Sequence, residues 1–487
     1  MKKRTMILFA AVLLSLILTF TFLFAAGGKP KEKEVMVEEK ELGPLPGEPM
    51  DKMATRIAKA LAEGKKIELH VLLTWDAPGQ ALLKVIPDWE AATGIKVFTE
   101  PLSTIEMSQK VNLELASGEP EYDIIQYDRY IHKPVLENPG VLNLDPYIAK
   151  YDPEFGTMIR PGLEEWGIAD DGTHRAMPFY WCNYIMAYRK DLIENSKEKS
   201  AFRAKYGYDY DIDNLTWDGS FMDLAEFFTR DTDGDGKVDF WGNAEMYAPY
   251  AACDTYMARY LNYWDRDKPS FLSDPATGQC TINDAAGVRA FEDMLEVVYM
   301  GSTVPEILQT DWASILGTFA SGRSAVAFQY APTWSPIQAE SSEFKISGPD
   351  QVGFAHVPGI KGKPRSTQDC GWISFITGNT DIPEIAYLFT IWAASEEIDR
   401  KMAMTSLHNP IRKATYVDPE VVAVNPTFAA QFQYAENMYT TPDHLIYEEE
   451  ILIVSNAMAA LVNKEVTFKQ AIGNICKEVA DKWAEVK

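Results

Sequence analysis

The stretch MPFYWCNYIMAYRKDL, from Met177 to Leu192, constrains the fold of this chain more than any other segment. It contains five aromatic residues, and its first charged residue is Arg189. Aromatic side chains bury large apolar areas, so a segment this rich in them is typical of a core β-strand. Ring faces beside polar groups such as Asn183 also suit a small polar ligand with apolar patches. The stretch is therefore either a core strand or a strand that displays its rings in a cleft.

The composition allows a large core and excludes one class of partner. The chain has 487 residues, 46% of them hydrophobic, which is enough for two or three domains of ordinary size. Its 46 basic and 71 acidic residues give a formal net charge of −25. Such a charge repels phosphate backbones, and the chain has no basic patch interleaved with aromatic residues. We therefore expect no nucleic acid partner.

The N-terminus has the features of an export signal. A basic start (KKR) precedes an uncharged run from Met6 to Ala26, and small residues follow it. The run is also long enough to cross a bilayer, so an uncleaved anchor is the alternative. Either reading of residues 1–27 puts the body in the periplasm or the extracellular space. Residues 28–64 begin as a charged, proline-bearing segment, which we expect to be a tether.

Strand, helix and strand follow one another after this tether. The segment IELHVLLTW, which ends at Trp75, predicts a strand, Gln80–Ala92 predicts a helix, and Ile95–Phe98 predicts the next strand. This spacing is typical of a βαβ unit with parallel strands. The segment YDIIQY, which ends at Tyr127, predicts another short buried strand.

The ends of these strands carry candidate ligand contacts, because ligands of open α/β sheets bind beyond the carboxyl ends of strands. The residues there are Trp75, Asp76, Tyr127, Asp128 and Arg129. For Asp128 and Arg129, a local ion pair or a helix cap is the alternative interpretation.

The segment DTDGDGKVD, from Asp231 to Asp239, resembles a calcium-binding loop. Aspartates at positions 1, 3, 5 and 9 and a glycine at position 6 follow the EF-hand spacing, but Gly242 stands where that loop has its Glu. The candidate ligands are Asp231, Asp233, Asp235, Lys237 (through its carbonyl) and Asp239. A solvated turn held by Asx hydrogen bonds is the alternative. A structural Ca²⁺ is the only cofactor that the sequence suggests, and none is required.

The five cysteines do not form a metal site or a dense disulfide framework, because they lie far apart in the sequence. At most two disulfides can form, and Cys253 with Cys280 is one conceivable pair. The chain also lacks GxGxxG, HExxH, GxSxG and CxxC motifs, and its six histidines are scattered. A pair of catalytic carboxylates, as in glycosidases, stays open because such a pair is defined by distance in space.

Nine segments stand in a distinctive order between Lys66 and the C-terminus. They are WEAATGIKVF, LASGEPEYDII, VLNLDPYI, MPFYWCNYIMAYRKDL, LTWDGSFMDLAEFFTRDTDGDGKVDFWG, FASGRSAVAFQYAPTW, HVPGI, the Gly-Trp strand at Gly371, and NPIRKATYVDPEV. This series resembles the family 1 extracellular solute-binding proteins of ATP-driven sugar importers, the maltose-binding-protein-like group. Arg189 departs from the family pattern, which usually has Asn there.

The resemblance implies a non-enzymatic α/β protein with the two-lobed periplasmic-binding-protein fold of type II, closing through interlobe hinge strands. It implies a first lobe of residues 65–177 and 349–394 and a second of residues 178–348 and 395–487. Such a protein binds a mono- or oligosaccharide between its lobes and delivers it, as a monomer, to the membrane permease of an ABC importer. The same fold with a non-sugar solute and a secreted carbohydrate-active enzyme are the alternatives.

The resemblance also suggests ligand contacts. Tyr127 falls where the family has a stacking Trp, Asp128 and Arg129 match its Asp-Arg pair, and Trp334 matches the Trp after its Gly-Pro turn. Tyr447 or His444 lies where the family has an aromatic residue near the start of a late helix. Strand-tip position and residue type add further candidates, namely Trp75, Asp76, Tyr180, Trp181, Asn183, Tyr330, Asp369, Trp372 and His408.

In this family the aromatic stretch corresponds to the first crossing between lobes. Pro178–Asn183 is then expected to line the hinge and the cleft floor, and Tyr184–Leu192 to continue as a buried strand of the second lobe. This division predicts that Trp181→Ala weakens ligand binding more than folding, and that Ile185→Ala does the reverse.

Overall fold

The computed structural model describes residues 42–118, 121–129, 133–153, 155–158, 163–265, 272–406, 408–432, 438–440 and 444–486. The chain divides into two units after Pro44, and Leu45–Lys487 is the compact unit that contains the fold. The expected export segment and the first part of the expected tether lie outside the described residues. Among the described helices, none has both the length and the apolar character that crossing a membrane requires.

A mixed sheet begins with β1 (Glu68–Thr74), β2 (Lys96–Leu102) and β3 (Ile124–Asp128), and continues with β8 (Gln368–Ile376). The order is β2-β1-β3-β8, with β1 parallel to β2 and β3, and β8 antiparallel to β3. Helix α3 (Ala77–Thr93) connects β1 to β2, so the predicted βαβ unit is confirmed. We call these four strands, with the first half of β4, the first sheet segment.

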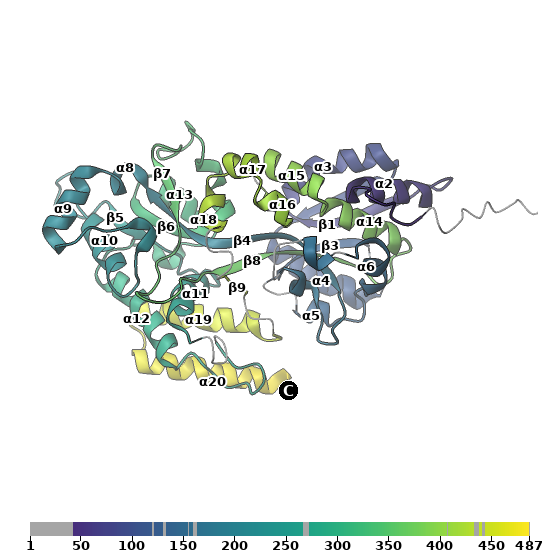
Figure 1. Ribbon diagram of the computed structural model, residues 1–487. Coiled ribbons are helices and arrows are strands. Elements are labelled where there is room, and N and C mark those ends of the chain that lie inside the picture. The colour runs from purple at the N-terminus through teal and green to yellow at the C-terminus, as the bar shows by residue number, and fades with distance from the viewer. Residues whose placement is uncertain are drawn as a thin grey trace, which may run out of the picture. The chain divides into compact units, whose positions relative to one another are not determined.

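Strand β4 (Ala176–Arg189) joins this segment to a second one (Figure 1). Its first half pairs with β8 up to Asn183, which lies opposite Asp369. Its second half pairs with β6 (Ser324–Tyr330) from Tyr184 onward, and with β7. The strand therefore changes partners between Asn183 and Tyr184, at the position predicted from the sequence. Every residue of β4 before Arg189 is buried, as expected of a strand covered on both faces.

The second sheet segment consists of the second half of β4 with β6, β5 (Trp241–Ala244) and β7 (Val352–Ala355). Strand β6 is parallel to β5 and antiparallel to β4, and β7 is antiparallel to β4. Helix α10 (Ser220–Phe228) packs on β5, and α13 (Ser314–Ala320) packs on β6.

Three helices pack together beside the first sheet segment: α2 (Met50–Leu61), α14 (Pro383–Ala393) and α15 (Glu396–Ser406), with α15 also touching α3. Helix α2 buries an apolar stripe at helical spacing, so it belongs to the folded unit although we expected a tether up to residue 64. An ion pair of 2.5 Å between Lys401 and Asp88 ties α15 to α3. Helix α15 therefore lies with the helices of the first segment, whereas residues from 395 onward were expected in the second lobe.

A large apolar cluster is built by α11 (Ala251–Tyr263), α12 (Ala285–Tyr299), α19 (Tyr447–Val462) and α20 (Phe468–Val486). A disulfide between Cys280 and Cys476 connects the segment before α12 to α20. The pairing of Cys253 with Cys280 is therefore wrong. Cys253 is on the buried face of α11, where it is a free thiol 2% exposed inside the cluster.

The remaining elements are short or lie at the periphery of these groups. They are α4 (Thr104–Ser117), α5 (Lys133–Leu136), α6 (Asp145–Tyr151), α7 (Phe155–Met158), α8 (Lys190–Ile193), α9 (Ser196–Tyr206), α16 (Lys413–Tyr416), α17 (Pro419–Val424), α18 (Thr427–Phe432), β9 (Tyr439–Thr440), and the 3₁₀ helices η3 (Glu164–Gly167), η4 (Ile212–Asn214), η5 (Ile307–Gln309) and η6 (Ala331–Ile337).

Candidate functional site

Three candidate residues form one row across adjacent strands. Asp128, the last residue of β3, pairs with Trp372 on β8, and Trp372 pairs with Tyr180 on β4. Paired residues of antiparallel strands project to the same face of the sheet, so these side chains are neighbours. Trp372 and Tyr180 are 6% and 2% exposed. The row combines a carboxylate with two nearly buried rings.

The end of β1 reaches this row. Trp75 directly follows the strand and is 62% exposed. The Oγ1 atom of Thr74 donates a 3.2 Å hydrogen bond to Oδ2 of Asp76. Desolvation raises the pKa of Asp76. Burial raises the pKa of the Tyr180 hydroxyl, and the neighbouring Cys182, Cys370 and Asp76 contribute in the same direction.

His408 packs against the aromatic part of β4. Its ring centroid lies 5.0 Å from that of Tyr180 and 5.4 Å from that of Phe179. Burial lowers the pKa of His408 to about 3, so its imidazole is neutral at physiological pH. A neutral imidazole provides one hydrogen-bond donor and one acceptor without a charge.

Tyr127 and Arg129 are both 3% exposed. Burial raises the pKa of Tyr127 to about 12, and its hydroxyl lies 3.4 Å from Oγ of Ser108. The guanidinium of Arg129 lies 5.2 Å from the ring of Trp166, a cation–π contact. Tyr447 at the start of α19 is buried, which raises its pKa, and the nearby Arg129 acts against this rise. Arg129 thus links β3 to η3 through the ring of Trp166.

Asn183 and Asp369 face each other across β4 and β8 and are 0% and 1% exposed. Among the described residues, neither Oδ1 nor Nδ2 of Asn183 has a hydrogen-bond partner. A buried amide without partners is destabilising, and such groups in native proteins are nearly always bonded to protein, water or a ligand. Asn183 therefore offers an unused donor and an unused acceptor among the described residues.

Tyr330 was predicted from the sequence, whereas its neighbours Asp254 and Trp312 were not. Asp254, in the first turn of α11, accepts a 2.6 Å hydrogen bond from Nε1 of Trp312 and a 2.9 Å hydrogen bond from the Tyr330 hydroxyl. Asp254 is 2% exposed, whereas Trp312 is 43% exposed. Neither residue lies at the tip of an expected strand or in a segment that resembles the family, and these were the criteria that selected the other candidates.

The backbone near Asp254 has one residue with an unusual conformation and one hydrogen bond to a neighbouring strand. Tyr250, which precedes α11, has φ 67°, a left-handed conformation that is costly for a residue other than glycine and is often found at functional sites. The backbone carbonyl of Asp254 accepts a 2.9 Å hydrogen bond from Nε2 of Gln368, the first residue of β8. Strand β8 and helix α11 are thereby held together beside the row of rings.

Two candidate tryptophans lie in the core. Trp181 is 0% exposed, donates a 2.6 Å hydrogen bond from Nε1 to the carbonyl of Pro410, and packs 5.0 Å from Tyr416. Trp334 is also 0% exposed and packs edge-on against Phe319. Trp334 belongs to η6, which directly follows Tyr330. The burial of Trp181 indicates that its removal will also cost stability.

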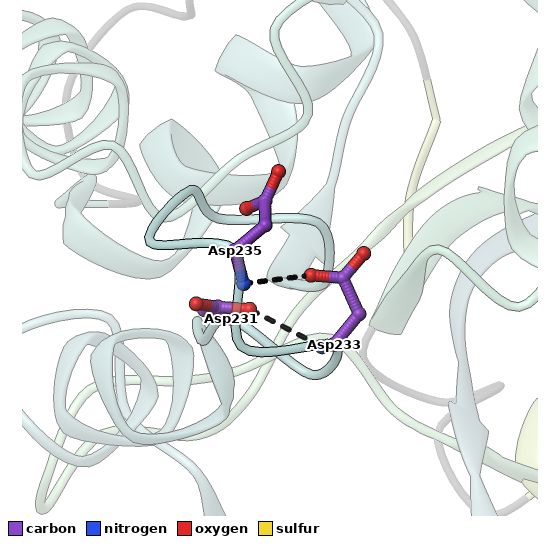
Figure 2. A group of neighbouring side chains, drawn as sticks. All are labelled: Asp231, Asp233 and Asp235. Atoms are coloured by element: carbon purple, nitrogen blue, oxygen red, sulfur yellow. Dashed lines mark hydrogen bonds between the residues drawn. The ribbon is translucent and has the colours of Figure 1, made fainter.

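The acidic loop is closed by its own hydrogen bonds (Figure 2). The carboxylate of Asp231 accepts bonds of 2.6 Å and 2.7 Å from the amides of Gly234 and Gly236, and Asp239 accepts bonds from Thr232. Asp231, Asp233 and Asp235 each offer a carboxylate oxygen within 4.8 Å of the others. Asp239 closes the loop outside this triad, and the amide of Lys237 donates a 2.8 Å bond to Asp235. An exposed triad of aspartates is therefore present in an Asx-bonded turn.

A shallow surface pocket of about 440 Å³ lies on α12. It is lined by Glu292, Leu295, Glu296, Tyr299 and Met300. None of the candidate ligand contacts lines this pocket, so it is separate from the row of Asp128, Trp372 and Tyr180.

Solved structures with the same fold cover most of this chain. A maltose-bound MalE3 of T. maritima has a TM-score of 0.68 at 20% identity, over 85% of this chain and 99% of that one. A solute-binding protein of Agrobacterium radiobacter K84 in complex with ribitol has a TM-score of 0.69 at 18% identity, over 85% and 98%. A substrate-binding protein of Listeria monocytogenes in complex with cycloalternan has a TM-score of 0.69 at 17% identity, over 86% and 100%. The fold is thus the α/β periplasmic-binding-protein fold of MalE.

The sequence itself matches a protein family over most of its length. The profile described as bacterial extracellular solute-binding protein matches residues 74–400, from the end of β1 into α15. This range includes the row of Asp128, Trp372 and Tyr180 as well as Asp254 and Trp312. The members of the family bind solutes and are not enzymes. The chain belongs to the bacterial extracellular solute-binding proteins.

Proposed function

We propose that this protein binds a neutral sugar or sugar alcohol beside β4 and β8 and delivers it to the permease of an ABC importer. The observation that carries the proposal is the partly exposed ring of Trp312, which the buried carboxylate of Asp254 holds together with Tyr330. An indole fixed at its polar edge leaves its apolar faces for the C–H surface of a pyranose or a polyol. Several of the other candidate rings are nearly buried and leave less surface.

Polar groups of the candidate set suit the hydroxyl groups of such a ligand. Asp128 and Asp76 offer carboxylate acceptors, the amide of Asn183 offers a donor and an acceptor, and His408 is neutral. A site that combines ring faces with several acceptors and donors suits polyhydroxy compounds, each hydroxyl of which both donates and accepts. We also propose Arg129, Tyr127, Tyr330, Asp369, Trp372, Trp75 and Tyr447 as contacts or close neighbours of the ligand.

The solved relatives support this ligand class. Their structures contain maltose, ribitol, cycloalternan and, in a protein of Agrobacterium vitis S4, D-mannitol. All four compounds are neutral and rich in hydroxyl groups. The identities of 17–20% support the shared fold and leave the choice among such compounds to this chain's own residues.

We propose further that the two sheet segments belong to two lobes and that β4 and β8 are the hinge strands between them. The first lobe comprises about residues 65–177 and 349–394, together with α2 and α15, because these helices pack on α14 and α3. The second lobe comprises about residues 178–348 and the part of 395–487 that follows α15. Ligand binding then closes the lobes, in a monomer that residues 1–27 export from the cytoplasm or anchor to the membrane.

A titration panel tests the ligand class. Maltose, ribitol and D-mannitol are added separately to the protein, and the heat of binding and the unfolding temperature are measured. A ligand that binds only the folded state stabilises it by about 2.7 kcal/mol at a concentration one hundred times its Kd, so at least one compound or a close relative is expected to raise the unfolding temperature. Binding of polyamines or peptides, with no response to any neutral sugar or polyol, overturns the proposal.

For the acidic loop, we propose a structural Ca²⁺ held by Asp231, Asp233 and Asp235 with the carbonyl of Lys237. The aspartate triad supports this, since hard cations bind carboxylate oxygens. Addition of millimolar Ca²⁺ is expected to raise the unfolding temperature of the wild type but not of Asp233→Asn. An equal response of both proteins contradicts the site.

A further inference from the structure

Cys182 and Cys370 lie directly opposite each other on β4 and β8. Their sulfur atoms are 3.3 Å apart, and both residues are thiols in this structure. Opposite residues of antiparallel strands have Cα atoms about 4.5 or 5.5 Å apart, and both values lie within the range of about 4.4–6.8 Å that disulfides require. The backbone is therefore already in place for a bond, and the sulfurs need to approach by only roughly 1.3 Å.

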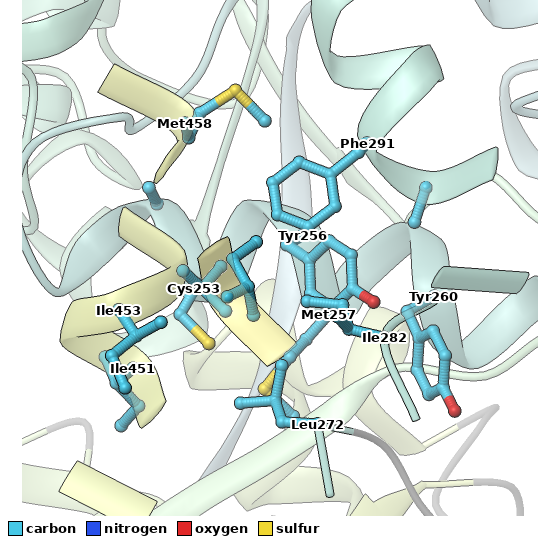
Figure 3. Packing of buried hydrophobic residues seen from close by; sticks show 14 of the residues in the cluster. Cys253, Tyr256, Met257, Tyr260, Leu272, Ile282, Phe291, Ile451, Ile453 and Met458 are labelled. Atoms are coloured by element: carbon cyan, nitrogen blue, oxygen red, sulfur yellow. The ribbon is translucent and has the colours of Figure 1, made fainter. Parts of the chain in front are cut away.

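The third free cysteine does not compete for this pairing. Cys253 lies among the apolar side chains of α11 and α19 (Figure 3), and burial raises the pKa of its thiol well above the ordinary value. Cys280 and Cys476 are bonded to each other. The chain already contains one disulfide, and extracellular solute-binding proteins function where disulfides persist.

We propose that Cys182 and Cys370 form a second, reversible disulfide that links β4 to β8 one residue before β4 changes partners. The oxidant is a disulfide compound, either a small molecule or a protein. The Cys370 thiolate attacks one sulfur of the oxidant and forms a mixed disulfide, releasing one thiol. The Cys182 thiolate then attacks the Cys370 sulfur and releases the second thiol. In total, the two cysteines lose two protons and two electrons, and the oxidant becomes two thiols.

The exposure of the two cysteines sets the order of these steps. Cys370 is partly exposed, whereas Cys182 is 3% exposed, so the external disulfide reaches Cys370 first. Desolvation, with the hydrogen bond to Cys182, raises the pKa of the Cys370 thiol well above its ordinary value. Few thiolates are therefore present in the folded protein, so we expect its oxidation to be slow at neutral pH.

The bond also has a place in the candidate site. The neighbouring cross-strand pairs are Trp181 with Gly371 and Asn183 with Asp369. A covalent link between these pairs fixes the register of β4 against β8. Its effect on a bound solute rests on the proposed function, whereas the bond itself does not.

A count of free thiols tests the proposal. The full chain is exported into an oxidising compartment, purified without reductant, alkylated in denaturant and weighed. The wild type is expected to carry one alkyl group, on Cys253, and Cys182→Ser is expected to carry two, because Cys370 loses its partner. Three groups on the wild type and two on the variant overturn the proposal. A non-reduced digest must also contain the Cys182–Cys370 linked peptide, and a link from Cys253 to either residue overturns it.

Thermal unfolding tests the cross-link independently of any ligand. A reductant breaks both disulfides of the wild type, but only Cys280–Cys476 in the double variant Cys182→Ser, Cys370→Ser. The reductant is expected to lower the unfolding temperature of the wild type by roughly 2–8 °C more than that of the double variant. Equal decreases in the two proteins contradict a second bond. Because neither readout uses a solute, failure here leaves the proposed function standing, and the sugar panel can fail without affecting the thiol count.

Discussion

The indole Nε1 of Trp312 donates a 2.6 Å hydrogen bond to Oδ2 of Asp254. The donor's side chain is 43% exposed, and the acceptor's is 2% exposed. A buried carboxylate thus holds an exposed ring by its polar edge, and the same carboxylate holds the hydroxyl of Tyr330 through its other oxygen. Hydrogen bonds to a charged acceptor are stronger and more directional than neutral ones, so both rings are fixed before any ligand arrives.

We expect Asp254→Asn to weaken binding of the best ligand in the sugar panel roughly tenfold or more. The amide keeps one acceptor for the two rings and adds an NH₂ group that the ring donors cannot use. Calorimetry measures the change. Asp311→Asn is the matched control, because this carboxylate precedes Trp312 and bonds to Ser314 instead of either ring. An affinity loss of the same size in both variants contradicts the role of Asp254.

Trp181→Ala is expected to lower the free energy of unfolding by about 3–5 kcal/mol, because the ring is fully buried and bonded to Pro410. Ile185→Ala, also 0% exposed, is expected to cost about 2–5 kcal/mol. Urea unfolding of both variants measures these costs. A Trp181→Ala protein of nearly wild-type stability that no longer binds sugar restores the interpretation made from the sequence.

Asn183→Leu is expected to keep or increase stability while weakening ligand binding. The substitution removes a buried amide that has no partner among the described residues, and it keeps the number and branching of the side-chain heavy atoms. Asn243→Leu is the matched control, because this amide on β5 is equally buried and equally unpartnered in the described part of the chain. Binding measured by calorimetry should decline only for Asn183→Leu. Unchanged affinity in that variant excludes Asn183 as a contact.

The contribution of Asp399 to stability is expected to decrease as the pH rises from about 4 to about 6. Burial raises the pKa of Asp399 in the folded protein from 3.8 to about 6. The folded state therefore holds a proton that the unfolded state has released, and losing it across this window costs about 3 kcal/mol. Burial raises the pKa of Asp293 to about 6 as well, so both groups act in the same direction.

Urea unfolding at pH 4.5 and pH 7 checks this prediction. Asp399→Asn should show a smaller decrease between the two values than the wild type, because the amide does not titrate. Asp418→Asn serves as the control, since Arg400 lowers the pKa of Asp418 and its contribution has the opposite sign. An Asp399→Asn protein that keeps the full decrease contradicts the shifted pKa.

The parts of this molecule that depend on local pattern were predictable. Spacing of apolar residues located the βαβ unit, and the uncharged aromatic run located β4. The division of β4 after Asn183, where its pairing partner changes, came from the resemblance to the family. The burial of Trp181 was not predictable, because alternation along a strand distinguishes two faces without saying that both are covered. Since every residue of β4 before Arg189 is buried, the periodicity carries no information about exposure.

Contacts between segments that are distant in the chain could not be predicted from the sequence. Asp254 and Trp312 are separated by 58 residues, and Cys280 and Cys476 by 196. Cys280 and Cys476 meet because both belong to or pack against the apolar cluster of α11, α12, α19 and α20, and no spacing rule encodes that packing. Strand-tip position and residue type selected Tyr330 and Trp372, but they could not select an acidic residue in the first turn of a helix.

Because β4 serves two sheet segments, its length is under a stricter constraint than its composition. Successive side chains of a strand point to opposite faces, so one residue inserted or deleted near Asn183 would turn over every side chain on one side of the change. The rings paired with β8 would then keep their faces of the sheet, while the side chains paired with β6 would point to the opposite faces. A substitution in this segment changes the packing at one position, whereas an odd-numbered insertion or deletion would disrupt the packing of one whole half of the strand.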